Sequence, residues 1–263
     1  MRRGLMILDP IQEAARDQFQ RHSANYGKSH ILANTEDVAM ALAGIEVSPD
    51  SPALDVATGG GHTALYLASR GFSVTAADIS QAMLDSATSL AIERGLSIET
   101  RLHEAERFPY SEASFDLVTC RVAAHHFSDR EAFVREVTRV LKPGGHFLLI
   151  DGSIPDSEPV AEKWIHEVEK LRDPSHGRFL SPGSWRDLCE RNRLRVLRCD
   201  TAPFKQPDLN WYFETAGTNP ENRQKVLQLI RDAPDSARKV FRIAEEGGKT
   251  VWWWIRLSLV AQK

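Results

Sequence analysis

The feature that most constrains the fold is an apolar run, residues 53–57, followed directly by Thr58 and by three glycines at 59–61. A stretch with helical periodicity then extends to Arg70. Glycines in a strand-to-helix turn let backbone N–H groups approach a ligand, and the start of the helix offers further unpaired donors. A strand, a glycine turn and a helix in this order are typical of α/β proteins that bind nucleotides or related molecules.

Strands and helices continue to alternate up to Asp151. The expected strands are 72–77, 96–102, 115–120 and 146–150, and the expected helices are 80–94 and 130–142. Alternation of this kind predicts a Rossmann-like α/β fold, with a seven-stranded, mainly parallel sheet and helices on both faces. The Lys-Pro-Gly-Gly sequence at 142–145 is expected to form a turn, because proline and glycine end helices.

The two ends of the chain have a different pattern, and we expect a single domain, 1–263, with additions at both ends. Residues 1–45, helical from 11, should form a lid next to a ligand-binding core, 46–151. The C-terminal half, 152–263, should contain cap helices at about 158–192 and 207–244. It should also contain closing strands at 194–199 and 251–261, the last one antiparallel.

Composition limits the possible partners. The net charge is -3, so the chain has no overall positive field to attract nucleic acid or an anionic membrane. Three cysteines without metal-ligand spacing suit a reducing compartment. No uncharged apolar stretch has membrane-spanning length. We therefore expect a cytoplasmic protein with a small-molecule substrate, no metal, no nucleic-acid partner and no membrane insertion. The sequence leaves the oligomeric state open.

The glycine pattern alone allows two cofactors. Gly59, Gly61 and Ala64 satisfy G-x-G-x-x-A, and Asp78 has the spacing of a ribose-binding carboxylate, as in NAD enzymes. However, Asp55 lies inside the preceding strand, where it would repel a pyrophosphate but attract the sulfonium or ammonium of S-adenosylmethionine (SAM). No tyrosine is followed four residues later by lysine, which argues against one short-chain oxidoreductase version. An NAD-dependent oxidoreductase remains the alternative.

A longer series of motifs is more specific. Residues 54–62, LDVATGGGH, resemble motif I of the class I SAM-dependent methyltransferases, with Ala57 where many members have glycine. The likeness continues through 78–83, 108–109, 114–116, 120–127 and 142–145, and it covers nearly the whole chain. It is closest to the ubiquinone/menaquinone-biosynthesis branch. The resemblance implies methyl transfer from SAM to a small, partly apolar molecule, quinone-like or aromatic. A non-catalytic SAM-binding protein is a further alternative.

The resemblance also implies a cofactor site. Backbone in the glycine turn and the nearby Asp55 would hold the methionine part of SAM, and Asp78 would accept both ribose hydroxyls. Two apolar side chains would enclose the adenine, and the segment at 104–105 would contact its edge. A tyrosine of the N-terminal helix would close over the methionine end, and an arginine after the fourth strand would lie beside the cofactor or pair with a carboxylate. The implied cofactor-binding residues are Tyr26, Asp55, Ala57, Gly59, Gly61, Asp78, Ile79, Met83, Glu104, Ala105 and Arg121.

Catalytic residues are harder to identify, because SAM supplies the electrophile and the protein needs only to align the acceptor and remove a proton. His125 and His126 follow the fourth strand, and either is a candidate base or a packed side chain bonded to backbone. His176, in a loop between cap helices, is a candidate substrate contact or part of a helix-ending turn. The aromatic segment 211–213 either lines an apolar pocket or attaches the cap to the sheet.

Overall fold

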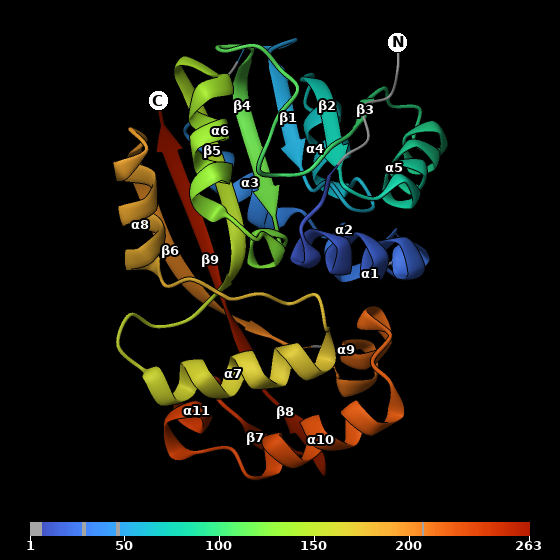
Figure 1. Cartoon of the computed structure of the whole chain (residues 1–263), viewed down its shortest axis with the longest axis vertical. Helices are drawn as coiled ribbons and strands as arrows, with labels where there is room; N and C mark the ends of the chain where they lie inside the picture. Colours follow the sequence, from blue (N-terminus) through green and yellow to red (C-terminus); the bar gives the residue numbers. More distant parts are fainter. Residues whose placement is uncertain (1–6, 28–29, 46–47, 207) are drawn as a thin grey trace.

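The sheet is built at the centre of the chain and closed by its last strand. The computed structural model describes residues 7–27, 30–45, 48–206 and 208–263, with backbone only for 24–27 and 30. In these residues seven strands form one sheet in the order β3-β2-β1-β4-β5-β9-β6 (Figure 1). The strands are β1 (Pro52–Val56), β2 (Ser73–Asp78), β3 (Glu99–Leu102), β4 (Phe115–Arg121), β5 (Leu141–Ser153), β6 (Arg195–Lys205) and β9 (Trp253–Gln262).

Strand direction confirms the predicted fold class. β1 is parallel to both β2 and β4, and the β2–β3 and β4–β5 pairs are parallel too. β9 is antiparallel to β5 on one side and to β6 on the other. The sheet is therefore mainly parallel with one reversed strand, as expected of the Rossmann-like arrangement. A crevice forms beyond the carboxyl ends of such parallel strands.

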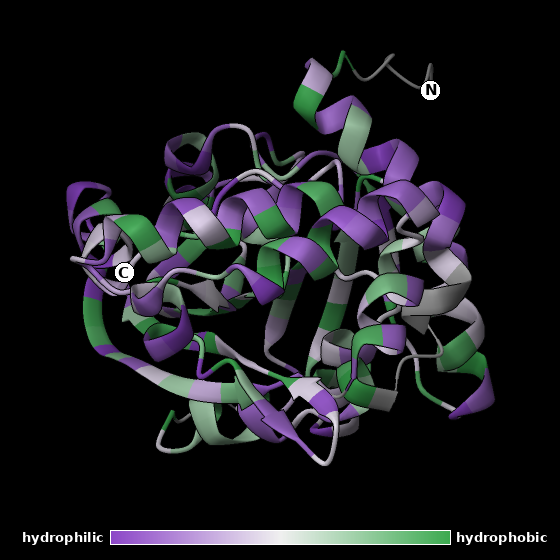
Figure 2. Ribbon diagram, turned by 90° about the horizontal axis from the view of Figure 1, so that it is seen from below, coloured by the Kyte–Doolittle hydropathy of each residue, from purple (hydrophilic) through white to green (hydrophobic). Residues whose placement is uncertain are grey.

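Helices cover both faces of the sheet, because each buries one apolar stripe. α3 (Glu36–Leu42) and α4 (His62–Ser69) contribute to the core on one face, and α6 (Arg130–Val140) and α8 (Pro182–Arg191) to the core on the other. α5 (Gln81–Glu93) packs on β2 and β3, and the Ser80 side chain caps its N-terminus. Figure 2 shows hydrophilic and hydrophobic residues alternating along the helices, as this packing requires.

The cap forms a second layer beyond the carboxyl ends of the strands (Figure 1). It contains α7 (Pro159–Arg172), α9 (Leu209–Ala216), α10 (Pro220–Arg231), α11 (Asp235–Val240) and the hairpin β7 (Ala244–Glu246)–β8 (Lys249–Val251). Its own core includes Trp164, Tyr212, Phe241 and Trp252. The segment from α9 to β8 is inserted between β6 and β9, where the sequence predicted cap helices at about 207–244.

One helix expected in the cap lies elsewhere. The predicted cap segment of about 158–192 includes α8, but α8 packs against β6 and α6 and buries Trp185 and Leu188 in the sheet core. The apolar stripe of α8 predicts a buried face without saying which apolar surface covers it. Of the two helices in that segment, α7 joins the cap core, as does Phe179 of the following loop.

The N-terminal helical stretch is divided into three. The helix expected from 11 to 45 is α1 (Pro10–Gly27), α2 (His30–Ala33) and α3 in the structure. Asn34 Oδ1 accepts a hydrogen bond of 2.9 Å from the Glu36 N–H. This local bond interrupts the helical stretch after α2, and α3 begins at Glu36. α1 contacts α5 and α9, so it spans sheet layer and cap layer (Figure 1). No helix formed by the described residues is long and apolar enough to cross a membrane.

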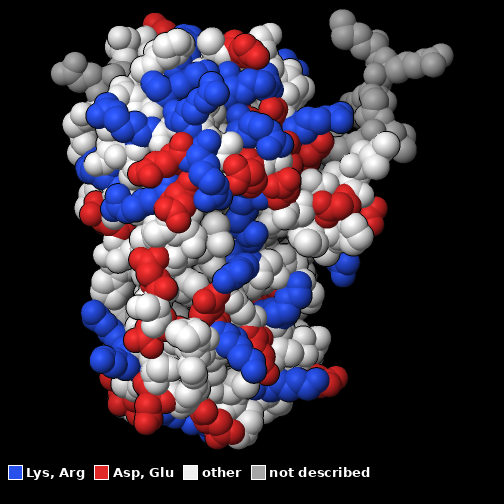
Figure 3. All heavy atoms as spheres, turned by 60° about the vertical axis from the view of Figure 1, so that its left-hand side comes forward, with Lys and Arg blue, Asp and Glu red and all other residues white. Residues whose placement is uncertain are grey.

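The charged surface is mixed where Figure 3 displays it. Lysine and arginine side chains alternate there with aspartate and glutamate over the sheet layer and the cap. Ion pairs such as Arg191–Glu131 (3.1 Å) and Arg139–Glu136 (2.7 Å) belong to this pattern of neighbouring opposite charges. Positive and negative side chains are therefore interspersed on this face, with lysine and arginine more frequent over its upper part.

Candidate functional site

One continuous cavity lies between the sheet and the cap. Its wall begins at the glycine turn after β1 and at the end of β2, and it passes the end of β4 and the short helix η1 (Ala124–His126). It ends among residues of α7, α9 and β9, while α1 and α2 close one side. The cavity thus joins a glycine-turn end to a cap end, at the position where doubly wound sheets bind their ligands.

The glycine turn leaves its backbone accessible to a ligand. Gly59 has φ +54°, and a Cβ atom built on it would meet no atom within 4 Å. Ala57 also lies in the left-handed region, at φ +52°, which glycine adopts more readily than alanine. Both residues line the cavity. Asp78 holds this turn, since its Oδ2 accepts from the Gly59 N–H at 2.9 Å and its Oδ1 from the Ser80 N–H at 2.9 Å.

Gly61 has a different role from the one expected. Its N–H donates to the Thr58 carbonyl, and a Cβ atom there would lie 2.7 Å from the Cβ of Ala87 in α5. Gly61 does not belong to the cavity wall among the described residues. The structure therefore assigns it to the close packing of α4 on α5, which a glycine pattern cannot distinguish from ligand contact.

Two buried carboxylates lie next to the glycine turn: Asp78 lines the cavity, whereas Asp55 is buried outside the cavity wall. Asp55 accepts from Thr58 Oγ1 and Thr119 Oγ1, each at 2.6 Å, and its side chain is enclosed beneath the turn. Burial raises the pKa of Asp55 to about 6 and that of Asp78 to about 6, against the hydrogen bonds that lower both. Each carboxylate would gain from a cation or a hydroxyl donor in the cavity. A molecule with a ribose diol and a cationic amino-acid end fits this pair.

The adenine-binding predictions divide in the structure. Ile79, Met83 and Ala105 line the cavity. Glu104 is not part of the wall, and its Oε1 lies 3.7 Å from Arg107 Nε. Glu106 takes a place in the wall that the sequence did not suggest. Glu106 accepts from the Ser128 N–H and from the Gln12 side chain of α1, so it links the cavity wall to the N-terminal helix. Residues 105–106 form a turn, so the sequence carried no periodic signal that would have favoured Glu106 over Glu104.

The sequence allowed Arg121 either to lie beside the cofactor or to pair with a carboxylate. In the structure it forms an ion pair with Asp37. Its Nε lies 3.0 Å from Asp37 Oδ2, and its two Nη atoms donate to the carbonyls of Leu32 and Asn34. The side chain borders the cavity but its donors fasten the α2–α3 segment to the end of β4. Tyr26 lies in the last turn of α1, and its side chain is outside the described residues.

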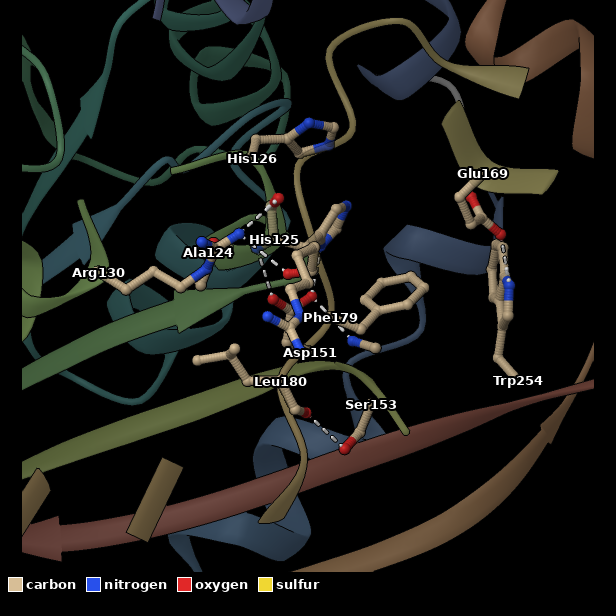
Figure 4. Close-up of polar contacts among 12 residues, drawn as sticks. Ala124, His125, His126, Arg130, Asp151, Ser153, Glu169, Phe179, Leu180 and Trp254 are labelled. Atoms are coloured by element: carbon tan, nitrogen blue, oxygen red, sulfur yellow. Dashed lines mark hydrogen bonds and ion pairs between the residues drawn. The ribbon is translucent and has the colours of Figure 1, made fainter. Parts of the chain in front are cut away.

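His125 is held in place by Asp151, which lies two residues before the end of β5. The Nδ1 atom of His125 lies 2.6 Å from Asp151 Oδ1, and Asp151 Oδ2 accepts from the His125 N–H at 2.9 Å (Figure 4). Burial, with the nearby His126, lowers the pKa of His125 well below its usual range. A neutral ring that donates Nδ1–H to Asp151 keeps Nε2 as an acceptor, and His125 lines the cavity.

The other two candidate histidines are placed differently. His126 also lines the cavity, while its Nδ1 lies 3.0 Å from the Ser175 carbonyl oxygen and 3.1 Å from Ser175 Oγ. His176 is buried outside the cavity wall, with its ring centroid 5.4 Å from that of His125 and 4.8 Å from that of Phe179. Burial strongly lowers the pKa of His176. His125 and His126 therefore line the cavity, whereas His176 is buried outside its wall.

The cap end of the cavity is aromatic and contains a buried acidic side chain. Glu169 Oε1 accepts from Tyr212 Oη at 2.9 Å and from Trp254 Nε1 at 2.8 Å, the second of which Figure 4 displays. Trp211 and Trp254 line the cavity, whereas Tyr212 and Phe213 belong to the cap core. The aromatic segment 211–213 therefore does both things that the sequence suggested, with one residue in the cavity wall and two in the core.

Among the described residues, no group of three or more histidine, cysteine, aspartate or glutamate side chains is arranged to hold a metal ion. The three cysteines are free and buried, and burial raises their thiol pKa values. The residues around the cavity can therefore supply hydrogen bonds, apolar contact and a neutral imidazole.

Comparison with known proteins decides the family. Residues 54–149 match the family model described as a methyltransferase domain. YcgJ of Bacillus subtilis, an uncharacterized methyltransferase, is 31% identical over 245 residues, which are 92% of this chain and 96% of YcgJ. The chain belongs to the class I SAM-dependent methyltransferases. Its cofactor is SAM, and this membership does not favour the NAD-dependent alternative.

Solved structures agree with this family assignment over most of the chain. The crystal structure of Bacillus subtilis YcgJ superposes with a TM-score of 0.79 over 88% of this chain and 99% of that one, at 30% identity. A structure from Bacillus halodurans gives 0.80 over 87% and 99%, at 28% identity. A demethylmenaquinone methyltransferase of Deinococcus radiodurans is 40% identical over 106 residues, 40% of this chain and 44% of that protein. This last match covers less than half of either chain.

Proposed function

We propose that this methyltransferase transfers a methyl group from SAM to a small, partly apolar molecule, quinone-like or aromatic. The observation that carries the proposal is the single cavity that connects the glycine turn with an apolar cap. The apolar wall includes Phe19, Phe127, Phe179, Trp211 and Trp254. A cavity of this kind suits a small molecule that is enclosed next to the cofactor, because enclosure excludes water and aligns the reacting atoms.

In the proposed complex, the chain holds the cofactor at the glycine-turn end. Asp78 accepts the ribose hydroxyls, Asp55 lies near the cationic amino-acid end, and Ile79 with Met83 contacts the adenine. SAM, when bound, supplies an electrophilic methyl group that the acceptor displaces in line. Ala57 and Gly59 give the backbone its close approach.

His125 is the proposed base. Its Nε2 would accept a proton from the acceptor's hydroxyl, amine or acidic carbon, while Asp151 holds Nδ1 and stabilises the imidazolium that forms. The distance of 2.6 Å between Nδ1 and Asp151 Oδ1 fixes the ring orientation. His126, bonded through Nδ1 to Ser175, is proposed to contact the acceptor without exchanging its proton.

The partial likeness to a demethylmenaquinone methyltransferase is the reason to place quinone-like phenols first among acceptors. Their hydroxylated rings match an aromatic wall and a histidine base. The matched segment covers less than half of either chain. We propose that the aromatic cap end of the cavity selects the acceptor of this protein.

The test has two steps. Calorimetric titration of the purified protein with S-adenosylhomocysteine (SAH) and separately with NAD should detect binding of SAH alone, and binding of NAD alone would reject the cofactor site described here. Transfer of a labelled methyl from SAM to a panel of phenols, hydroquinones, aromatic amines and peptides is then measured. Labelling of peptides but of no small molecule would reject the proposed acceptor class.

A further inference from the structure

Arg256 of β9 is a buried cation whose hydrogen-bonding capacity is only partly used. Its side chain is 12% exposed, and its Nη1 lies 3.0 Å from Asp37 Oδ2. No described residue accepts a hydrogen bond from its Nε or Nη2, and Arg256 belongs to the cavity wall. A guanidinium presents its N–H groups in a planar fork that matches a carboxylate.

The carboxylates near Arg256 are shared with other groups, so its positive charge is only partly compensated. Asp37 Oδ2 is shared with Arg121, whose Nε also lies 3.0 Å away, so two guanidinium groups depend on one carboxylate oxygen. The other nearby carboxylate, Asp151, has its oxygens occupied by His125 and Gly152. Burial lowers the pKa of Arg256 because it disfavours the charged guanidinium. An anion in the cavity would stabilise that charge.

Arg256 lies among aromatic rings at the cap end of the cavity. Its guanidinium carbon is 4.3 Å from the centroid of the Phe204 ring, and Phe204 is stacked parallel to Trp254 at 6.4 Å. Stacking on Phe204 fixes the plane of the guanidinium, and the same rings can contact the flat body of an aromatic ligand.

The same end of the cavity lies next to the proposed base. Arg256 is opposite Gly152 in the register of β5 and β9, one residue beyond Asp151. A Cβ on Gly152 would lie 2.2 Å from the Phe179 ring, so Phe179 packs directly on this glycine. The centroid of Phe179 is 5.1 Å from that of His125 (Figure 4). One aromatic ring thus contacts both the strand position facing Arg256 and the proposed base.

We propose that Arg256 binds the carboxylate of an aromatic acid, so that the methyl acceptor is an anionic aromatic molecule held between Arg256 and His125. This inference rests on the proposed function, because it concerns the acceptor of the same reaction. The acid's ring lies against Phe204 and Trp254, and its carboxylate receives N–H groups from Arg256. The methyl-accepting atom then faces His125.

SAM also has a carboxylate, and the experiment separates the two sources. SAH binding is measured first, by calorimetry, for the wild type, Arg256→Met, Arg256→Lys and Arg195→Met. Arg195 is the matched control, since it is an exposed arginine of β6 that donates to Gln262 far from the cavity. We expect all four proteins to bind SAH within about twofold of each other. A loss confined to the Arg256 variants would assign Arg256 to the cofactor and overturn the proposal.

Binding of four acids and their primary amides is then measured with SAH present: benzoate, 4-hydroxybenzoate, phenylacetate and 3-phenylpropanoate. In the wild type and Arg195→Met, at least one acid should bind about tenfold or more tightly than its amide, as one charge-assisted pair provides. Arg256→Met should remove this preference, and Arg256→Lys should retain part of it.

The proposal is overturned if acids and amides bind equally, if no acid binds, or if Arg256→Met keeps the preference. The comparison of acid with amide needs only the wild type, so a variant that fails to fold does not block the test. If the wild type binds no SAH, the proposed function fails. The acid preference, measured without SAH, still decides the role of Arg256.

Discussion

The Nδ1 atom of His125 and the Oδ1 atom of Asp151 lie 2.6 Å apart at the carboxyl ends of neighbouring parallel strands. This contact depends on the register of β4 and β5, because the two residues are 26 positions apart in the sequence. A second bond, from the His125 N–H to Asp151 Oδ2, fixes the backbone of η1 as well. The candidate base is therefore positioned by the sheet rather than by its own loop.

The protonation of His125 gives the first prediction. Since burial lowers its pKa well below the usual range, the ring should stay neutral in the folded protein between about pH 5.5 and 8. The chemical shift of its Cε1–H, followed by NMR, should be constant across that interval, whereas the same ring in the urea-unfolded protein should titrate near its reference pKa of about 6.5. A folded-state midpoint inside the interval would contradict the assignment.

His125→Gln gives the second prediction, through the chemistry. We expect kcat to fall by about 10²–10⁴-fold with little change in KM, because a general base acts in the transition state. SAH affinity, measured by calorimetry, should stay at the wild-type value, since the proposed cofactor contacts lie elsewhere. Unchanged kcat would return His125 to the packed, structural interpretation.

The pKa values of Asp55 and Asp78 give the third prediction. Both are raised to about 6, so the unliganded protein takes up protons at these residues as the pH falls below 6. A ligand that favours the ionised carboxylates must release those protons on binding. SAH affinity should therefore increase about tenfold or more between about pH 5 and 7. In Asp55→Asn the SAH affinity should depend less steeply on pH. An unaltered pH dependence in that variant would show that Asp55 is not one of the groups whose ionisation favours binding.

The same shift has a consequence for stability. A carboxyl group whose folded pKa is raised from 3.8 to about 6 stabilises the fold fully below its unfolded pKa, and this contribution is lost as the pH rises through 6. Near pH 7.5, Asp55→Asn should therefore raise the free energy of unfolding of the unliganded protein by about 1–3 kcal/mol. Urea unfolding provides the measurement. Near pH 4 the gain should vanish, and a gain independent of pH would contradict the burial argument.

Two glycines of one turn provide the fifth prediction. Gly61→Ala would place a Cβ 2.7 Å from Ala87 Cβ, at φ +86°, so we expect a loss of about 2–4 kcal/mol in unfolding free energy. Gly59→Ala meets no atom and should cost about 1 kcal/mol, yet it should weaken SAH binding more than Gly61→Ala weakens it in protein that remains folded. Gly144→Ala, also at positive φ with open space, controls for backbone strain alone.

The sequence identified the α/β core well, because its apolar runs are short and each is closed by a glycine, a cap or a carboxylate. It failed where tertiary pairing determines the length of an element. The strand expected to end at Cys199 continues to Lys205, through polar residues and Pro203, since β9 pairs with it along that whole length. The division of the stretch from 11 to 45 has a local cause at its second junction, where the Asn34 side chain accepts from the Glu36 N–H, and the expectation of continuous helix overlooked it.

The candidate site was predictable where a motif reports it and less so where the site is assembled from distant strands. Asp55, Gly59 and Asp78 follow from a local pattern; the structure places Gly59 and Asp78 in the cavity wall and Asp55 beneath the turn, bonded to Thr58. Asp151 and Arg256 had no comparable signal, because their importance arises from the register of β5 with its neighbours. The nearest clue for Asp151 was that a carboxylate ends a strand, as Asp78 does.

Strand β9 passes through both layers of the molecule. Trp252, just before it, is in the cap core, Trp254 and Arg256 line the cavity, and Leu257 is in the sheet core. Because β6 pairs with β9 as far as Trp253, the cap is joined to the sheet by a continuous ladder rather than by a hinge. Residues of the cap core, the cavity wall and the sheet core therefore follow one another along a single strand, so a shift in the register of β9 would alter all three together.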